Sequence, residues 1–150
     1  ILVDNSNLEN FKFSVEEEGI KQETLAIYAL SDFDVINHKR RENYNRYLDL
    51  LKENDILTFL QPKLDEGIVP LNFPVLISDN KREKLYFSLI EHDILTAALY
   101  YKLIPEVSND DFSNAIDISK SILNLPVHQD VDIHEIEHIC ETINQLISSL

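Results

Sequence analysis

The chain has 150 residues, of which 44% are apolar and 27% are charged, so its composition is that of one folded domain. No apolar run approaches the roughly 20 residues that a membrane span needs. The 27 acidic residues outnumber the 13 Lys and Arg residues, and the resulting net charge of −14 disfavours phosphate backbones and anionic lipid. We therefore expect no nucleic-acid partner and no membrane partner.

Glycine and cysteine are too scarce for several common sites. Gly19 and Gly67 are the only glycines in the sequence, so neither a GxGxxG turn nor a glycine-rich phosphate loop can be written. The single cysteine, Cys140, cannot form an internal disulfide, which favours a cytoplasmic location. The chain also starts at Ile1 and lacks Met throughout, which indicates an excised piece rather than a complete gene product.

The pattern of apolar residues predicts an α+β domain. Helices are predicted where apolar residues recur at helical spacing, over 20–30, 33–53, 81–92, 110–120 and 132–148. Strands are predicted for the apolar runs 56–62, 70–78 and 94–101. Pro74 removes a backbone donor, so the second run should be an edge strand or a bulged strand. Together they predict a small antiparallel sheet of about three strands with helices packed on one face.

The predicted domain covers residues 20–150, and residues 1–19 are expected to be a lead-in segment. Its helix over 33–53 has one apolar face, formed by Phe33, Ile36, Tyr44, Tyr47 and Leu51. Arg40 falls within this face, Arg41 lies at its edge and Arg46 points away. A guanidinium against apolar surface needs an anion or carbonyl groups, so Arg40 should meet an internal partner or an external anionic ligand.

Polar side chains also occur where predicted strands meet loops. Tyr100 and Lys102 stand at the end of the run 94–101, and His128 lies in the turn after Pro126. Loops next to strand ends commonly carry binding residues. The alternative is that these side chains are a structural tyrosine and surface residues.

The segment His134-Glu135-Ile136-Glu137-His138 matches the HExxH pattern of zinc hydrolases. Only twelve residues follow His138, too few for the usual third ligand, and both histidines lie opposite the isoleucine face of the predicted last helix. We therefore expect a water-facing helix surface and no metal site, and we keep a zinc hydrolase using His134, Glu135 and His138 as the weaker alternative. Cys140 lies on the isoleucine face, where a thiol is inert.

Three segments resemble the carboxy-terminal part of the DegT/DnrJ/StrS family of pyridoxal-phosphate aminotransferases. They are LAIYALSDFDVINHKRRENYNRYLDLL (25–51), DILTAALYYKLIPE (93–106) and NAIDISKSILNLPVHQDVDIHEIEHICETI (114–143). The first resembles the family helix with paired arginines, Asn and Tyr, here Arg40, Arg41, Asn43 and Tyr44. The last resembles the family's Leu-Pro turn followed by a terminal helix, here Leu125, Pro126 and His128.

The resemblance implies a small domain that packs on a large cofactor domain of the same polypeptide and closes over a substrate, often a nucleotide-linked keto sugar. It also implies pyridoxal phosphate in the full-length parent, bound by a lysine of the large domain, and a parent that forms dimers. This chain has no counterpart of that lysine motif, so we expect no catalytic residue and no bound cofactor here. The residues expected to line a substrate or domain interface are Arg40, Tyr100, Lys102 and His128.

A function of a different class is a stand-alone acidic interaction module that binds a protein through a sheet edge or an apolar patch. An upstream reading frame that encodes a large α/β domain would distinguish the two hypotheses.

Overall fold

The computed structural model describes residues 21–78, 80–98, 103–104, 107 and 112–149. The chain divides into two compact units, residues 1–32 and residues 33–150. The domain boundary predicted between residues 19 and 20 lies outside the described residues and stays a prediction. No helix of the described part is long and apolar enough to cross a membrane.

The described part of the first unit is the helix α1 (Gln22–Leu30), which has no buried residue. Its large apolar side chains are exposed, from 51% for Leu25 to 87% for Leu30. Within this unit the Ser31 hydroxyl donates to the carbonyl oxygen of Ile27 at 2.7 Å, which satisfies one carbonyl in the last turn of the helix.

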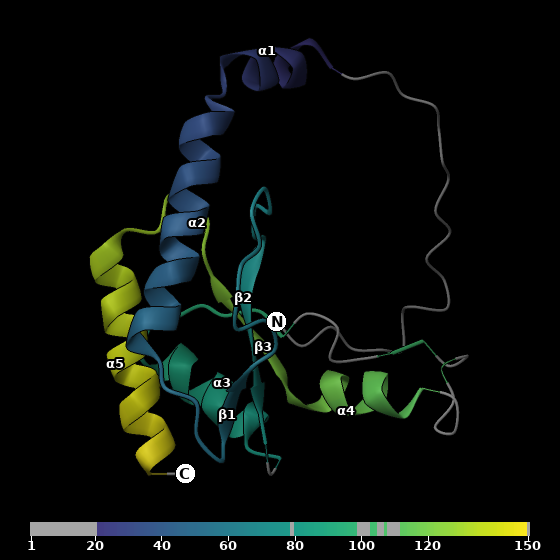
Figure 1. Cartoon of the computed structure of the whole chain (residues 1–150), viewed down its shortest axis with the longest axis vertical. Coiled ribbons are helices and arrows are strands. Elements are labelled where there is room, and N and C mark those ends of the chain that lie inside the picture. The colour runs from purple at the N-terminus through teal and green to yellow at the C-terminus, as the bar shows by residue number, and fades with distance from the viewer. Residues whose placement is uncertain (1–20, 79, 99–102, 105–106, 108–111, 150) are drawn as a thin grey trace. The chain divides into compact units, whose positions relative to one another are not determined.

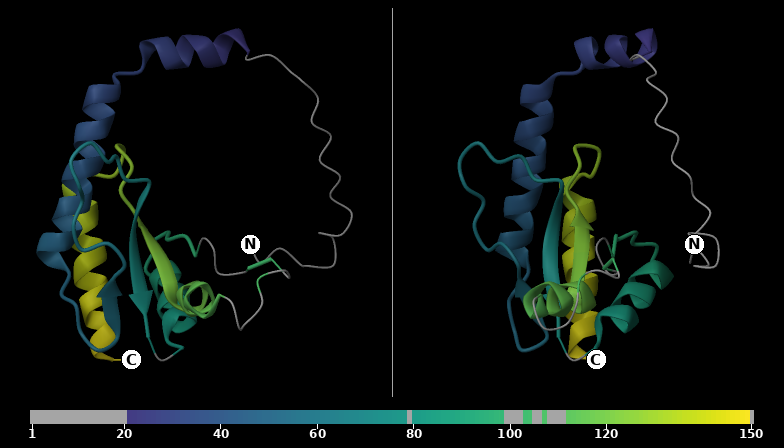
Figure 2. Two further views of the ribbon diagram at one scale, coloured as in Figure 1. Left: turned by 45° about the vertical axis from the view of Figure 1, so that its right-hand side comes forward. Right: turned by 90° about the vertical axis from the view of Figure 1, so that its right-hand side faces the viewer.

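The second unit is an α+β domain (Figure 1). Its elements are α2 (Phe33–Leu50), β1 (Leu57–Phe59), β2 (Asn72–Ile77), α3 (Arg82–Glu91), α4 (Ser113–Ser121), β3 (Ile122–Pro126) and α5 (Ile133–Ser148). The strands form one antiparallel sheet in the order β1-β2-β3. Helices α2 and α5 lie side by side on one side of this sheet, and α4 lies on the other side (Figure 2). The predicted α+β fold with a small three-stranded antiparallel sheet is confirmed.

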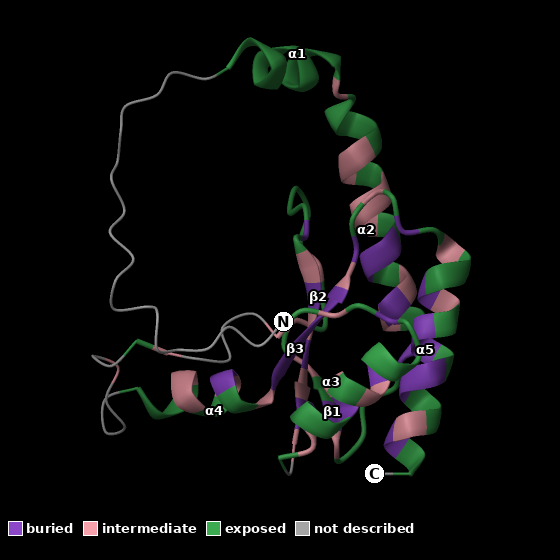
Figure 3. Cartoon of the chain, turned by 180° about the vertical axis from the view of Figure 1, so that it is seen from behind, coloured by how far each residue is buried: buried purple, intermediate pink, exposed green. Residues whose placement is uncertain are grey.

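The core is built around Phe73 in the central strand β2. The Phe73 ring lies 4.6 Å from the ring of Tyr44, 5.0 Å from that of Tyr47 and 5.3 Å from that of Phe59, measured between centroids. Buried and half-buried residues alternate along β2, so one face of the strand turns to the core, while α2, α3 and α5 supply the helical side (Figure 3). The predicted apolar face of the helix over 33–53 is confirmed for Tyr44, Tyr47 and Leu51, whereas Ile36 is half-buried and Phe33 is 43% exposed.

The prediction of a strand over 94–101 is wrong for the residues that the structure describes. Residues 94–98 contribute only an isolated bridge between Ala97 and Asn124, and residues 99–101 lie outside the described part. The third strand is β3, whose first four residues are all buried. Leu95, in contrast, is 78% exposed. A short apolar run alone does not determine whether the chain forms a strand, which explains the error.

The prediction that Pro74 marks an edge strand or a bulge is also wrong, because β2 is the central strand and pairs with β3 in unbroken register from Asn72 to Leu76. In an antiparallel sheet the N–H and C=O groups of one residue point to the same neighbouring strand. The carbonyl oxygen of Pro74 accepts from the amide of Leu60 at 3.2 Å, so its missing donor points to the same side. Strand β1 ends at Phe59, one residue before Leu60. The missing Pro74 donor therefore lies just beyond the end of β1 and removes no hydrogen bond between β1 and β2.

The outer edge of β1 is closed by the chain that precedes it. The Asn54 side-chain oxygen accepts from the amides of Ile56 at 2.8 Å and Leu57 at 2.9 Å, and the Asn54 amide donates to the Leu57 carbonyl at 2.9 Å. A carboxylate oxygen of Glu53 accepts from the Phe59 amide at 2.7 Å. The outward-facing amides of Leu57 and Phe59 and the Leu57 carbonyl are therefore not free to pair with an added strand.

Helix α5 begins with a capping box at Asp132. Its carboxylate accepts from the amides of His134 at 2.7 Å and Glu135 at 3.0 Å, and the Glu135 carboxylate accepts from the Asp132 amide at 2.8 Å. Asp132 is therefore the N-cap of this helix. The predicted inward face is buried at Ile136, Ile139, Cys140, Ile143 and Ile147, whereas Ile133 is half-buried.

Candidate functional site

Arg40 joins α2 to two loops. Its Nε donates to the side-chain oxygen of Gln129 at 3.1 Å, and its Nη1 lies 3.5 Å from the carbonyl oxygen of Pro70. The side chain is half-buried rather than enclosed. Of the expected partners for this guanidinium, the structure supplies a backbone carbonyl and a neutral amide oxygen. Arg41 makes similar bonds, to the carbonyl oxygens of Asp65 at 3.0 Å and of Ile68.

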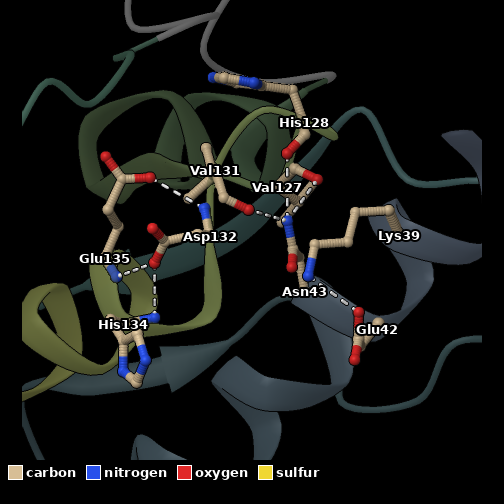
Figure 4. Close-up of polar contacts among 9 residues, drawn as sticks. All are labelled: Lys39, Glu42, Asn43, Val127, His128, Val131, Asp132, His134 and Glu135. Atoms are coloured by element: carbon tan, nitrogen blue, oxygen red, sulfur yellow. Dashed lines mark hydrogen bonds and ion pairs between the residues drawn. The ribbon is translucent and has the colours of Figure 1, made fainter.

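Asn43 lies one turn further along α2 and is completely buried. Its Nδ2 donates to the carbonyl oxygens of Val127, His128 and Val131, at 3.4, 3.1 and 3.0 Å (Figure 4). Tyr47 lies a turn beyond, and its hydroxyl donates to the Pro126 carbonyl at 3.1 Å. The segment between β3 and α5 is therefore tied to α2 over its length.

His128 stands in this segment with an exposed imidazole. Its Nδ1 lies 3.7 Å from a carboxylate oxygen of Asp130, and half of its side-chain surface is accessible to solvent. In Figure 4 the ring is directed away from Asn43, while the His128 carbonyl faces it. An exposed imidazole on a tethered backbone can donate to or accept from a ligand without losing an internal partner other than Asp130.

The predicted site residues are described only in part. Arg40 and the His128 segment are brought together, because Arg40 bonds to Gln129, the neighbour of His128. Tyr100 and Lys102 lie outside the described residues, so their place in a site stays a prediction. A surface hollow of about 590 Å³ adjoins Gln129, lined by Asp34, Val35, Ile36, His38 and Lys39.

The roles of Asn43 and Gln129 are not among the predicted ones. Asn43 does carry a signal in the sequence, which is its position between Arg40 and Tyr47 on the helix. An amide within a buried stripe must find hydrogen-bond partners, as Arg40 must. Gln129 carries no such signal, because an exposed turn can contain glutamine for many reasons.

Arg46, predicted to point away from the apolar face of α2, forms an ion pair with Glu137 of α5, and both side chains are about one-third exposed. The Glu137 carboxylate also lies 3.2 Å from Nδ1 of His134. Hydrogen bonds from Arg46 and then from His134 hold the pKa of Glu137 below its usual value. The pair joins the two long helices.

The zinc-hydrolase alternative is not favoured by this arrangement. His134 is 86% exposed, and the Glu135 carboxylate that would activate water is used by the helix cap. Among the described residues no three metal-ligating side chains form a cluster. Cys140, predicted to be inert, is buried, and burial raises the pKa of its thiol to about 12.

The described residues do not fit pyridoxal phosphate, the cofactor that the family resemblance implies. A Schiff-base lysine is activated by desolvation or by a neighbouring cation. No lysine of the described part is buried, and Lys39, which is half-buried, pairs with Glu42 at 2.9 Å. We derive no step of a cofactor reaction from these residues.

Comparison with known proteins relates the chain to one family. The family model for DegT/DnrJ/EryC1/StrS aminotransferases matches residues 22–144. No curated protein matches the sequence.

Solved structures share the fold. PseC from Helicobacter pylori, an aminotransferase involved in the biosynthesis of pseudoaminic acid, is 20% identical with a TM-score of 0.71, over 93% of this chain and 43% of its own. DesV from S. venezuelae, solved with a ketimine intermediate, is 18% identical with a TM-score of 0.72, and the match covers 91% of this chain and 40% of DesV. NtdA from Bacillus subtilis, with bound cofactor PMP, is 20% identical with a TM-score of 0.65, and the match covers 76% of this chain and 29% of NtdA. The chain thus spans less than half the length of each.

Proposed function

Because the chain belongs to the DegT/DnrJ/EryC1/StrS aminotransferase family, we propose that it is the C-terminal small domain of a pyridoxal-phosphate-dependent sugar aminotransferase. In this proposal it packs on a large cofactor domain of the same polypeptide, closes over the substrate and is not catalytic alone. The parent protein is cytoplasmic and dimeric. The family match over residues 22–144 is the observation that carries the proposal.

The proposed substrate is a nucleotide-linked keto sugar. Such a molecule presents hydroxyl, carbonyl and phosphate oxygens, which imidazole, guanidinium and ammonium groups bind. His128 offers an exposed imidazole on a backbone that is hydrogen-bonded to α2, and Arg40 holds the adjacent residue Gln129. Tyr100 and Lys102 complete the proposed interface.

Pyridoxal phosphate, when bound to the parent, supplies the electron sink for amino transfer. The residues of this chain have other tasks. His128 binds and orients the substrate, Arg40 and Asn43 hold the segment that carries it, and closure of the domain excludes water from the reaction.

The test uses the protein encoded by the reading frame that contains this chain, extended upstream of residue 1. We expect a lysine-bearing α/β domain there and amino transfer from an amino-acid donor to a nucleotide-linked keto sugar. His128→Ala should raise the KM for the sugar about tenfold or more and leave the reaction with the amino donor unchanged. His138→Ala, on an exposed part of α5, is the matched control.

Two results would overturn the proposal. One is that no cofactor domain is encoded in frame and none co-purifies with the chain. The other is that amino transfer to the sugar is insensitive to His128→Ala. The rival interaction module is not favoured, because the family match accounts for residues 22–144 and the Leu57 and Phe59 amides at the outer edge of β1 are already bonded to Asn54 and Glu53.

A further inference from the structure

The segment 126–131 is fastened to α2 by side chains from three successive turns of that helix. Tyr47 donates to the Pro126 carbonyl at 3.1 Å, and Arg40 donates to the Gln129 side chain at 3.1 Å. Between them, Asn43 donates to the carbonyl oxygens of Val127, His128 and Val131. Asn43 is therefore the central attachment of the segment.

The chemistry of the Asn43 amide determines its orientation. An amide nitrogen has two hydrogens, and three carbonyl oxygens lie within 3.4 Å of Nδ2, so one hydrogen is shared. The Oδ1 atom is buried and has no hydrogen-bond partner among the described residues. A flipped amide would turn Oδ1 toward three carbonyl oxygens, which repel it. Asn43 thus acts as a donor only, directed at this one segment.

The backbone at His128 is fixed while its side chain is free to act. The His128 carbonyl accepts from Asn43 at 3.1 Å and from the Val131 amide at 3.1 Å, which closes a turn. The imidazole points away from these bonds and is half-exposed (Figure 4). A binding residue on a loop is effective when a rigid scaffold holds that loop.

From this geometry we infer that Asn43 is a positioning residue, which sets the place of the His128 imidazole by fixing the carbonyls on either side of it. The identity of the ligand that His128 binds rests on the proposed function. The attachment of the segment 126–131 by Asn43 does not depend on that function, and it can be measured on the 150-residue chain itself.

The first experiment is amide hydrogen exchange of the wild-type chain and of Asn43→Ala. Protection of the Val131 amide, which bonds to His128, should fall roughly tenfold or more, while the amides of Leu123 and Leu125 in β3 change less than about twofold. Asn45→Ala, an exposed asparagine on the same helix, should change neither. An equal loss in β3 and at Val131 would mean that Asn43 only supports the fold, and no loss at Val131 would also overturn the inference.

A second variant keeps the test valid if Asn43→Ala does not fold. Tyr47→Phe removes only the hydroxyl that holds Pro126 and keeps the ring that packs on Phe73. Asn43→Ser keeps one hydroxyl donor at position 43 and serves as the milder Asn43 variant. Protection of the Val131 amide should fall in both variants, and it should fall by less in Tyr47→Phe than in Asn43→Ser. Unchanged protection in both variants would contradict the inference.

The second experiment separates positioning from general stability in the full-length parent. Asn43→Ala should raise the KM for the sugar in the same direction as His128→Ala and leave the reaction with the amino donor unchanged. An effect of His128→Ala without an effect of Asn43→Ala would overturn the positioning role alone. If His128→Ala has no effect, the proposed substrate role of His128 is wrong, whatever hydrogen exchange shows at Val131.

Discussion

The charge of Arg40 is held by two neutral acceptors, the side-chain oxygen of Gln129 and the carbonyl oxygen of Pro70. Loss of this guanidinium therefore leaves no buried carboxylate unpaired. We expect Arg40→Leu to lower the free energy of unfolding by about 1 kcal/mol, the scale of one partly exposed hydrogen bond. Urea denaturation measures this change.

Arg40→Lys is the matched variant, because it keeps the charge and loses the planar donor group. It should lose a similar amount, since the acceptors are neutral. A loss above about 3 kcal/mol for Arg40→Leu is the size expected for a broken buried ion pair and would contradict this account of Arg40.

Asn43 should tolerate aspartate less well than alanine. Asn43→Asp has the same shape but turns a carboxylate toward three carbonyl oxygens in a buried site, so we expect a loss of about 3–5 kcal/mol at pH 7. Burial and the carbonyls raise the pKa of the introduced carboxyl in the folded state. The deficit relative to wild type should therefore shrink as the pH falls through that raised pKa, because the protonated acid can donate to a carbonyl.

Denaturation of both proteins at matched pH values between 4 and 7 measures this deficit. This pH range is chosen because the carboxyl introduced by Asn43→Asp should have a folded-state pKa above the ordinary aspartate value of about 3.9. Asn43→Ala supplies the reference, because its deficit has no new titrating group and should stay level. A deficit for Asn43→Asp that does not change with pH would show that the amide is not directed at the carbonyls.

The long periodic helices were predictable from the sequence, and the strands were predictable only in part. Helix α5 has a capping residue and a continuous isoleucine face, so its residues alone determine its type and its buried side. The runs 94–101 and 122–126 are both short and apolar, and which of them joins the sheet depends on the packing of α4 and β2, which no local pattern encodes. The central place of β2 likewise depends on where β1 ends opposite Pro74.

The closed edge of β1 depends on Asn54. Asn54→Ala removes the acceptor of two backbone amides, those of Ile56 and Leu57, and we expect a loss of about 1–2 kcal/mol. Thermal or urea denaturation measures it. Asn144→Ala, an exposed asparagine on α5, should change stability by less than about 0.5 kcal/mol. Equal effects of the two substitutions would mean that the Asn54 turn does not stabilise the edge.

The contact between α2 and α5 should depend on pH through Glu137. Hydrogen bonds from Arg46 and His134 lower the pKa of Glu137 in the folded state. A lowered carboxyl pKa stabilises the fold above the unfolded-state value, and this contribution is lost as the pH falls through the folded-state value. Glu137→Gln should therefore lower the Tm at neutral pH, and the difference from wild type should close at acid pH.

Glu141→Gln is the matched control, since it removes the same charge one turn further along α5, where the side chain is exposed. Its effect on the Tm should be smaller than that of Glu137→Gln at neutral pH. A difference between wild type and Glu137→Gln that stays constant down to acid pH would contradict the role of the Arg46 pair.

The sequence predicted the family of the molecule, whereas its site residues stay predictions. His128 is a candidate because it follows a Leu-Pro pair that resembles the family's turn, and Arg40 is a candidate because a charge within an apolar stripe needs a partner. The attachment between them, from Asn43 to carbonyls more than 80 residues away in the chain, has no sequence signature because any residue can supply a carbonyl. Such contacts follow from the packing of α2 against the 126–131 segment.

The isolated chain should form no specific aldimine with pyridoxal phosphate. Activation of a Schiff-base lysine requires a buried or electrostatically perturbed amine, and the lysines of the described part are exposed or half-buried. Incubation with pyridoxal phosphate followed by borohydride should therefore label several lysines at low occupancy, without the absorbance band of a bound aldimine. Peptide mass spectrometry after reduction measures this distribution, and the full-length parent is the control, in which one lysine of the cofactor domain should carry the label. A single stoichiometric adduct on one of the nine lysines of this chain would contradict the proposal that the cofactor belongs to another domain.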